Sequence, residues 1–274
     1  MNFDVLLPLA LFLISLAGLT FFSKFAGKLE PLFQGQRIRV RDALLIVLFL
    51  GAMVTAVVFI PGNILQILFL FSCSSLLFLL VYIIFPAKWP VAFILPGVFL
   101  LLYFFYWNIW LMDVFAVLLI LSVIMYTSAV FTWKATLAFA GFLTVMDVVQ
   151  VFGTKYMAIV AEKATSMLLP LLIVVPTFPL QGYVSLGLGD LMLTGLFVNQ
   201  TAQKWGKRYG YICCGSIALV LLLGELILFN TPFHFLPATI FVSVGWLVTL
   251  GLIRLTPIMK TDQTTQDSSK EKDQ

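Results

Sequence analysis

The chain has 274 residues, of which 62% are hydrophobic and only 10% are charged, whereas soluble domains carry about 25% charged residues. So few charges cannot cover a soluble particle of this size, which excludes a soluble enzyme, a disordered protein and a secreted domain built on disulfides. The net charge of +4 does not indicate nucleic-acid binding, because the basic residues lie in short loops between apolar runs.

Apolar runs recur along the whole chain and predict an all-α polytopic membrane protein, since a transmembrane helix needs about 20 mainly apolar residues. We expect nine transmembrane helices, at Phe3–Phe22 and at about 43–60, 64–85, 91–107, 110–131, 135–152, 186–202, 210–229 and 237–255. The first run lacks the basic segment of a signal peptide, so we expect a retained helix. The polar residues 261–274 are expected to form a disordered tail.

Basic residues gather in the loops that follow the odd-numbered helices. The first such loop, from Lys24 to Arg41, carries five, and the later ones carry Lys88, Lys134, Lys204, Lys207 and Arg208. Lys and Arg accumulate on the cytosolic side of membranes. The pattern therefore predicts an N-terminus outside and a C-terminus in the cytosol, and the compact length favours a prokaryotic, for example archaeal, cell membrane.

Four acidic residues fall inside the predicted spans, where an ionised carboxylate costs about 2.5–3.5 kcal/mol on insertion scales. Asp113 follows Trp107 and Trp110 and is expected at a wet helix end, and Glu225 is expected to have a structural or interfacial role near the outer end of its helix. Asp147 and Asp190 call for another explanation, because each belongs to a patterned stretch of sequence.

Asp147 lies near the end of the sixth predicted helix, and Asp190 begins the seventh, so the two helices leave and enter through one face of the membrane. Adjacent packing of these helices would bring both carboxyl groups to one depth. An aspartic hydrolase needs such a pair, one ionised carboxylate to take a proton from water and one protonated acid to polarise the scissile carbonyl. Like-charge repulsion and desolvation favour a single proton on such a pair.

Two glycines precede the second aspartate in Gly187-Leu188-Gly189-Asp190. A backbone without side chains would let this helix approach a neighbour closely and would let the segment before Asp190 stay non-helical. The four-residue pattern is weak alone and becomes specific when a second intramembrane aspartate lies one span earlier.

The stretch from Asp147 to Ala161 (DVVQVFGTKYMAIVA) and the stretch from Ser185 to Asp190 (SLGLGD) resemble the two catalytic motifs of the presenilin and signal peptide peptidase family of intramembrane aspartyl proteases. The resemblance covers about 135–255 and is closer to the signal peptide peptidase branch, which also has its N-terminus outside. It implies a nine-helix presenilin-like fold in which Asp147 and Asp190 are catalytic and Gly187, Leu188 and Gly189 belong to the active-site motif.

On this resemblance, residues 1–133 form a five-helix scaffold and residues 134–260 form the catalytic part. The family's third element, a Pro-Ala-Leu motif, is matched best by Pro237-Ala238-Thr239, in which Thr239 replaces leucine; Pro232-Phe233-His234 is the less favoured match. The family usually has tyrosine before the first aspartate, where this chain has Met146, so a contact by that hydroxyl is not expected.

A long irregular segment, about 153–184, separates the sixth and seventh predicted helices. Its apolar stretch from Met167 to Thr177 contains Pro170 and Pro176 and is too short and too interrupted to span the membrane. A helical substrate must unwind before hydrolysis, and adding a strand to an exposed edge would satisfy its freed backbone. We therefore expect a re-entrant or extended segment that pairs with substrate through Leu171, Leu172, Ile173, Val174 and Val175; a plain re-entrant or surface loop is the alternative.

These features predict an intramembrane endopeptidase whose partners are the lipid bilayer and transmembrane-helix or signal-peptide substrates; self-association into a homo-oligomer is compatible with the sequence. No metal or other cofactor is expected, because His234 is the single histidine and the three cysteines lack ligand spacing. An ion- or proton-coupled transporter or channel would also use intramembrane carboxylates. A prepilin-peptidase-type protease is less favoured, because its motif usually has lysine where this chain has Met192.

Overall fold

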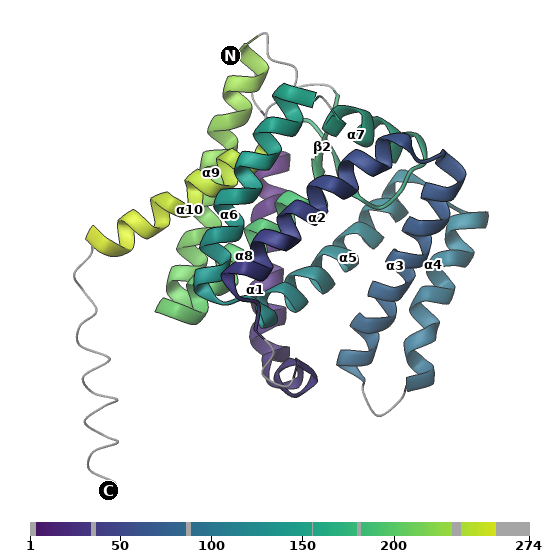
Figure 1. Cartoon of the computed structure of the whole chain (residues 1–274), viewed down its shortest axis with the longest axis horizontal. Coiled ribbons are helices and arrows are strands. Elements are labelled where there is room, and N and C mark those ends of the chain that lie inside the picture. The colour runs from purple at the N-terminus through teal and green to yellow at the C-terminus, as the bar shows by residue number, and fades with distance from the viewer. Residues whose placement is uncertain are drawn as a thin grey trace, which may run out of the picture.

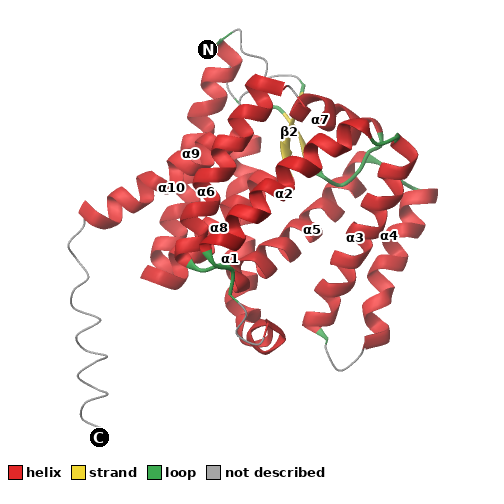
Figure 2. Ribbon diagram, in the orientation of Figure 1, coloured by secondary structure: helices red, strands yellow, loops and turns green. Residues whose placement is uncertain are grey.

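The computed structural model describes residues 4–33, 37–85, 89–154, 156–179, 182–231 and 237–255. These residues form a helical bundle with one two-stranded antiparallel sheet (Figures 1 and 2). The tail at 261–274 and the Pro232-Phe233-His234 motif lie outside the described residues. The elements are α1 (Leu6–Phe33), α2 (Val40–Phe59), α3 (Gly62–Ile84), η1 (Trp89–Phe93), α4 (Ile94–Phe105), α5 (Ile109–Val130), α6 (Trp133–Val148), η2 (Val149–Thr154), α7 (Tyr156–Ser166), β1 (Leu172–Pro176), β2 (Tyr183–Gly187), α8 (Leu188–Trp205), α9 (Lys207–Asn230) and α10 (Ala238–Leu255).

Seven of the described helices are long and apolar enough to cross a membrane: α1, α2, α3, α5, α6 continued by η2, α9 and α10. The prediction of a multi-pass helical membrane protein is thereby confirmed. Of the two other predicted spans, the one at 91–107 is a shorter apolar helix, Trp89–Phe105, and the one at 186–202 is α8. Figure 1 shows α3 beside α4 on one side of the molecule and α9 beside α10 on the other.

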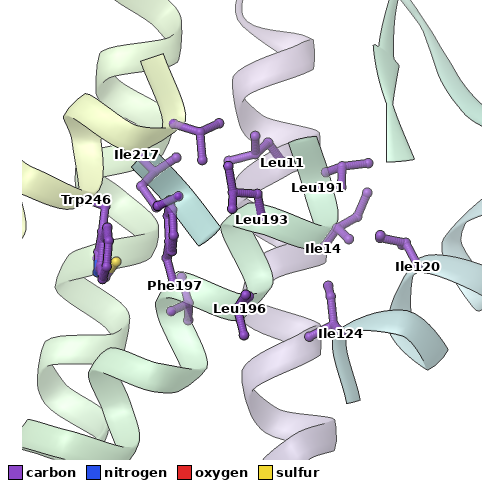
Figure 3. Packing of buried hydrophobic residues seen from close by; sticks show 14 of the residues in the cluster. Leu11, Ile14, Ile120, Ile124, Leu191, Leu193, Leu196, Phe197, Ile217 and Trp246 are labelled. Atoms are coloured by element: carbon purple, nitrogen blue, oxygen red, sulfur yellow. The ribbon is translucent and has the colours of Figure 1, made fainter. Parts of the chain in front are cut away.

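Helix α8 lies at the centre of the bundle and packs against α1, α5, α6, α9 and α10. Every residue from Leu193 to Thr201 is buried, and Leu193, Leu196 and Phe197 belong to the main core cluster (Figure 3). Its polar side chains bind within the protein: Gln200 donates to Phe131 O at 2.9 Å and Thr201 accepts from Trp246 Nε1 at 3.0 Å. A helix surrounded by protein does not need an apolar exterior, which explains its lower hydropathy.

Helices α9 and α10 approach closely at Gly245. A Cβ atom at this position would lie 2.6 Å from the Cα of Ile217 and 3.1 Å from its nitrogen, so backbone would have to move. We expect Gly245→Ala to lower the free energy of unfolding by about 1–3 kcal/mol. Thermal unfolding in detergent measures this loss. Gly251→Ala on the same helix is the control, because a Cβ there meets nothing within 4 Å; equal effects of the two changes would contradict the prediction.

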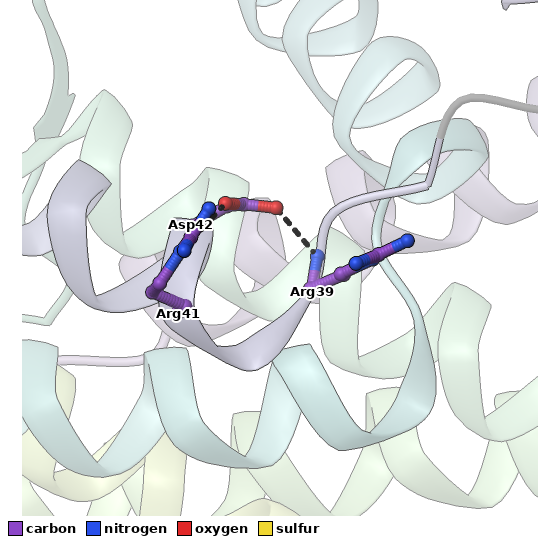
Figure 4. A network of polar contacts seen from close by, with 3 residues as sticks. All are labelled: Arg39, Arg41 and Asp42. Atoms are coloured by element: carbon purple, nitrogen blue, oxygen red, sulfur yellow. Dashed lines mark hydrogen bonds and ion pairs between the residues drawn. The ribbon is translucent and has the colours of Figure 1, made fainter.

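Several boundaries differ from those predicted. Helix α1 continues to Phe33 instead of ending at Phe22, so Lys24 and Lys28 lie on a helix, and Lys28 Nζ donates to Ile84 O at 3.1 Å. A helix with long basic side chains can extend to the membrane surface, because the apolar stems of these side chains cover apolar surface while their charged ends reach water. The next helix, α2, begins after Arg39, whose N–H donates to Asp42 Oδ2 at 3.1 Å (Figure 4).

The segment predicted as irregular, about 153–184, is ordered into the end of η2, the helix α7 and the hairpin of β1 and β2. Lys163 of α7 holds this segment to the end of α2. Its Nζ donates to the carbonyl oxygens of Val57, Val58 and Ile60 at 3.1, 2.7 and 3.2 Å, which uses all three of its protons. A cation on the last carbonyls of a helix also complements the helix dipole.

Candidate functional site

Asp147 occupies the penultimate position of α6 and is buried, with 7% of its surface exposed. Directly after α6 the chain widens into the π-helix η2, a form that occurs frequently at functional sites. The neighbouring Met146 points elsewhere: its methyl group lies against Gly51 of α2, where a Cβ atom would clash with it. Gln150 of η2 also donates to Gly51 O at 3.3 Å. The α2 contact therefore fixes the end of α6 that carries Asp147.

Asp190 lies in the first turn of α8, immediately after β2. Gly187 is the last residue of β2 and the N-cap of α8, with extended backbone angles of −68° and 143°. No side chain caps this helix start. An acidic residue in the first turn is favoured there by the helix dipole. The side chain is partly buried, so the sequence places a carboxyl group where a strand turns into the central helix.

The structure brings these two aspartates together. Helix α6 packs against α8, and the carboxyl groups of Asp147 and Asp190 are close enough for their charges to interact. In the part of the chain that the structure describes, no hydrogen bond joins the two carboxyl groups. Two acids from different helices thus lie near each other, which is the arrangement that shared acid–base chemistry requires.

The Pro237-Ala238-Thr239 stretch opens α10, which packs against both α6 and α8. Pro237 lies just before the first helical residue, where its missing N–H costs nothing. Thr239 is buried, and its hydroxyl lies beside the Asp147 carboxyl without reaching hydrogen-bond geometry. Three helices therefore contribute to one site, and the threonine that replaces the expected leucine places a hydroxyl next to an aspartate.

The glycines of the motif do not serve the close packing that we expected. A Cβ atom at Gly187 would meet only Asp190 Oδ2, at an ordinary 3.6 Å, and a Cβ at Gly189 would meet nothing within 4 Å. Gly189 is helical, whereas Gly187 is extended as the last residue of β2, so the non-helical stretch before Asp190 ends at the first glycine of the motif. These glycines instead leave open space beside Asp190, and the close helix packing occurs at Gly195 and Gly245.

The strand predicted within the connecting segment exists, as β1 over Leu172–Pro176, with Leu171 just outside it. It pairs antiparallel with β2 in the register Leu172↔Gly187 to Pro176↔Tyr183. The Leu188 N–H donates to Leu171 O and the Thr177 N–H donates to Gly182 O, which shows which residues of each strand bond to the partner strand and which alternate with them. The backbone groups of residues 172, 174 and 176 in β1, and of 183, 185 and 187 in β2, therefore point away from the partner strand.

The outer edges of the two strands differ. On β1, the outward N–H of Val174 donates to Asp113 Oδ1 of α5 at 2.9 Å and Pro176 has no N–H, so Leu172 is the one residue of this strand whose outward N–H makes no hydrogen bond within the described residues. On β2, the outward N–H groups of Ser185 and Gly187 make no hydrogen bond within the described residues. The strand that leads into Asp190 thus has the more open edge, whereas from the sequence we expected substrate to pair with the β1 segment.

Asp113 is a structural residue that sequence reasoning missed. We expected a wet helix end, and the structure shows its carboxylate holding β1 through the Val174 N–H. An acidic residue inside an apolar span was the available signal, because such a residue needs a partner. The pairing itself joins residues 61 positions apart and could not be foreseen from local sequence.

Glu225 of α9 is the fourth intramembrane acid and is 4% exposed. Neither of its carboxyl oxygens has a hydrogen-bond partner among the described residues, and its charge interacts with that of Asp4. Asp4 is itself satisfied, because it accepts from the N–H groups of Leu6, Leu7 and Phe178 at 3.2, 3.2 and 2.8 Å. The sequence did not foresee this second acidic pair.

Within the described residues, no group of three or more His, Cys, Asp or Glu side chains could hold a metal ion. Cys73, Cys213 and Cys214 are free and buried among apolar residues, as packing residues would be.

The chain matches no protein-family model and is similar to no curated protein.

Proposed function

We propose that this protein is an intramembrane aspartyl endopeptidase that hydrolyses peptide bonds within transmembrane helices or signal-peptide remnants. One observation carries the proposal: two carboxyl groups, from α6 and from the first turn of α8, lie together inside a multi-pass helical protein. The resemblance of the surrounding motifs to the presenilin and signal peptide peptidase family supports the same activity. Nine spans and a presenilin-like fold belong to this proposal.

The chemistry follows from a pair of acids that shares one proton. The ionised aspartate takes a proton from a water molecule, whose oxygen attacks the scissile carbonyl carbon while the protonated aspartate donates to the carbonyl oxygen. Collapse of the tetrahedral intermediate breaks the C–N bond, and the amine leaves with a proton from the pair. Because water is the nucleophile, no covalent enzyme intermediate forms. The proton belongs to the pair and not to either aspartate.

The outer edge of β2 supplies what an unwound substrate needs. A transmembrane helix hides its peptide bonds in its own hydrogen bonds, and unwinding leaves polar groups that are costly in a lipid environment. Pairing with the outward groups of β2 satisfies them and aligns the substrate along the strand that ends at Asp190. We therefore place the substrate strand on β2, with β1 as the inner strand of the sheet.

Within this proposal the N-terminus lies outside a prokaryotic cell membrane and the C-terminus in the cytosol, as the distribution of basic loops indicates. The motif residues Leu188, Pro237, Ala238 and Thr239 contact substrate or the aspartates. The enzyme requires neither a metal nor another cofactor.

The direct test incubates the purified protein in detergent with a fluorescently labelled transmembrane peptide and identifies the products by mass spectrometry. We expect new peptide termini within the hydrophobic segment, and none with Asp147→Ala or Asp190→Ala. Cleavage that persists in both variants, or that a chelator abolishes, would contradict an aspartyl mechanism.

The space beside Gly189 gives a separate prediction. Because a Cβ atom there meets nothing within 4 Å and Gly189 is exposed, Gly189→Leu should leave the thermal unfolding temperature nearly unchanged while filling the space next to Asp190. We expect the cleavage rate to fall at least about tenfold, a loss of about 1.4 kcal/mol of transition-state binding. Gly141→Leu on α6 is the matched control, because it is also exposed and unobstructed. Equal cleavage by the two variants would show that no substrate occupies this space.

A proton- or ion-coupled transporter is the second candidate, and Glu225 is the observation that favours it. A buried carboxyl group without a hydrogen-bond partner, near a second acid, is typical of proton relays in membranes. Reconstituted liposomes with a pH-sensitive dye inside test this function. Proton flux that Glu225→Gln abolishes, together with no peptide cleavage by the wild type, would replace the protease by a transporter.

A further inference from the structure

A surface cavity with a mixed polar and apolar lining lies between α1 and α9. Its volume is about 210 Å³, and its lining is Leu19, Thr20, Ser23, Lys24, Lys207 and Tyr211. On α1, Thr20, Ser23 and Lys24 share one face through their spacing of three and four residues, and Lys207 and Tyr211 do so on α9. The Thr20 hydroxyl donates to Ala17 O at 2.8 Å within α1. Ser23 and Tyr211 therefore supply the hydroxyl donors of the lining, and Lys24 and Lys207 supply its ammonium groups.

The charge of this cavity is not neutralised by the protein. No acidic side chain lines it, and the one ion pair within the described ranges joins Arg41 and Asp42. The N-terminus of α9 adds to the positive field, because Lys207 is its first residue and its N-cap, Gly206, offers no side-chain cap. Two cations, hydroxyl donors and a helix N-terminus together favour an anion with several acceptor oxygens.

The position of the cavity matches the surface of a bilayer. Lys24 follows the start of α1 by 18 residues, which is about 27 Å along a helix and close to the ~30 Å hydrocarbon thickness. The buried Leu19 lines the cavity, and away from the lysines the two helices carry exposed apolar side chains, Leu9 and Leu13 on α1 and Leu219 and Leu223 on α9. A ligand there has a polar end at the lysines and apolar surface beneath it.

We propose that this cavity binds the phosphate headgroup of an acidic phospholipid, with the acyl chains lying along the exposed apolar surface of α1 and α9. A free phosphate ion shares the headgroup chemistry and lacks the chains, so it would not use the apolar surface. The proposal does not depend on peptidase activity, since it rests on the cavity and on the membrane-spanning helices alone.

Thermal unfolding of the full chain in detergent tests the site. We expect short-chain phosphatidylglycerol to raise the unfolding temperature saturably, with much weaker effects of short-chain phosphatidylcholine and of inorganic phosphate. The Lys24→Gln/Lys207→Gln variant should bind phosphatidylglycerol about 30-fold more weakly, at about fivefold per lysine. Lys134→Gln removes one exposed basic charge at a position that does not line the cavity and should bind as the wild type does.

A second variant separates site occupancy from net charge. Ser23→Trp keeps both lysines and fills the cavity, so it should also abolish the phosphatidylglycerol shift. Equal shifts in the double variant and in Lys134→Gln, or equal shifts by the two lipids, would overturn the proposal. A full shift by inorganic phosphate alone would assign the site to a free anion and overturn the lipid.

Discussion

Asp147→Asn and Asp190→Asn are each expected to abolish cleavage, lowering the rate by at least about 10³-fold, because asparagine has the shape of the acid and cannot take or donate the catalytic proton. Their carboxyl groups act as a unit, so the double variant should be no slower than either single one. Product formation from a labelled transmembrane peptide measures all three rates.

Asp113→Asn is the matched control for these changes, since it makes the same replacement of a carboxyl oxygen by an NH2 group in a third intramembrane aspartate. Its amide oxygen can still accept from the Val174 N–H, so most of the activity should remain. If the effects of Asp147→Asn and Asp190→Asn multiply in the double variant, or if either single variant keeps substantial activity, then Asp147 and Asp190 do not share one reaction.

Ser185→Pro is expected to lower the cleavage rate at least about fivefold with the hairpin intact. The Ser185 N–H points away from β1, so proline at this position removes no hydrogen bond between the two strands. Loss of this N–H leaves one carbonyl of a paired substrate without a partner. An unsatisfied buried group costs about 1–3 kcal/mol, which corresponds to roughly 5–150-fold in rate.

Leu172→Pro provides the control on the other edge, because the Leu172 N–H also points outward, from β1. If substrate pairs with β2, Leu172→Pro retains cleavage and Ser185→Pro does not. The reverse outcome would place the substrate on the β1 edge, as the sequence predicted, and equal rates would contradict edge pairing altogether. Unfolding temperatures of both variants check that the sheet is retained.

The sequence alone predicted the membrane class of this protein and the positions of its acids. Apolar runs located the spanning helices, because the bilayer imposes length and hydropathy on every segment that crosses it. The helix start just before Asp190 and the extended segment between Pro170 and Pro176 also followed from local sequence, since Pro fixes its own φ angle and lacks an N–H, while Gly allows backbone angles that other residues avoid. The catalytic role of Asp147 and Asp190 stays a prediction.

Only the tertiary structure decided how these parts meet. It showed that α8 is the central helix, that Thr239 lies beside Asp147, that Asp113 holds β1, and that β2 has the more open edge. Each of these facts joins segments far apart in the chain. Hydropathy and turn signals describe only the surroundings of a single segment, whereas the choice of partner depends on how side chains from several helices fill the same space.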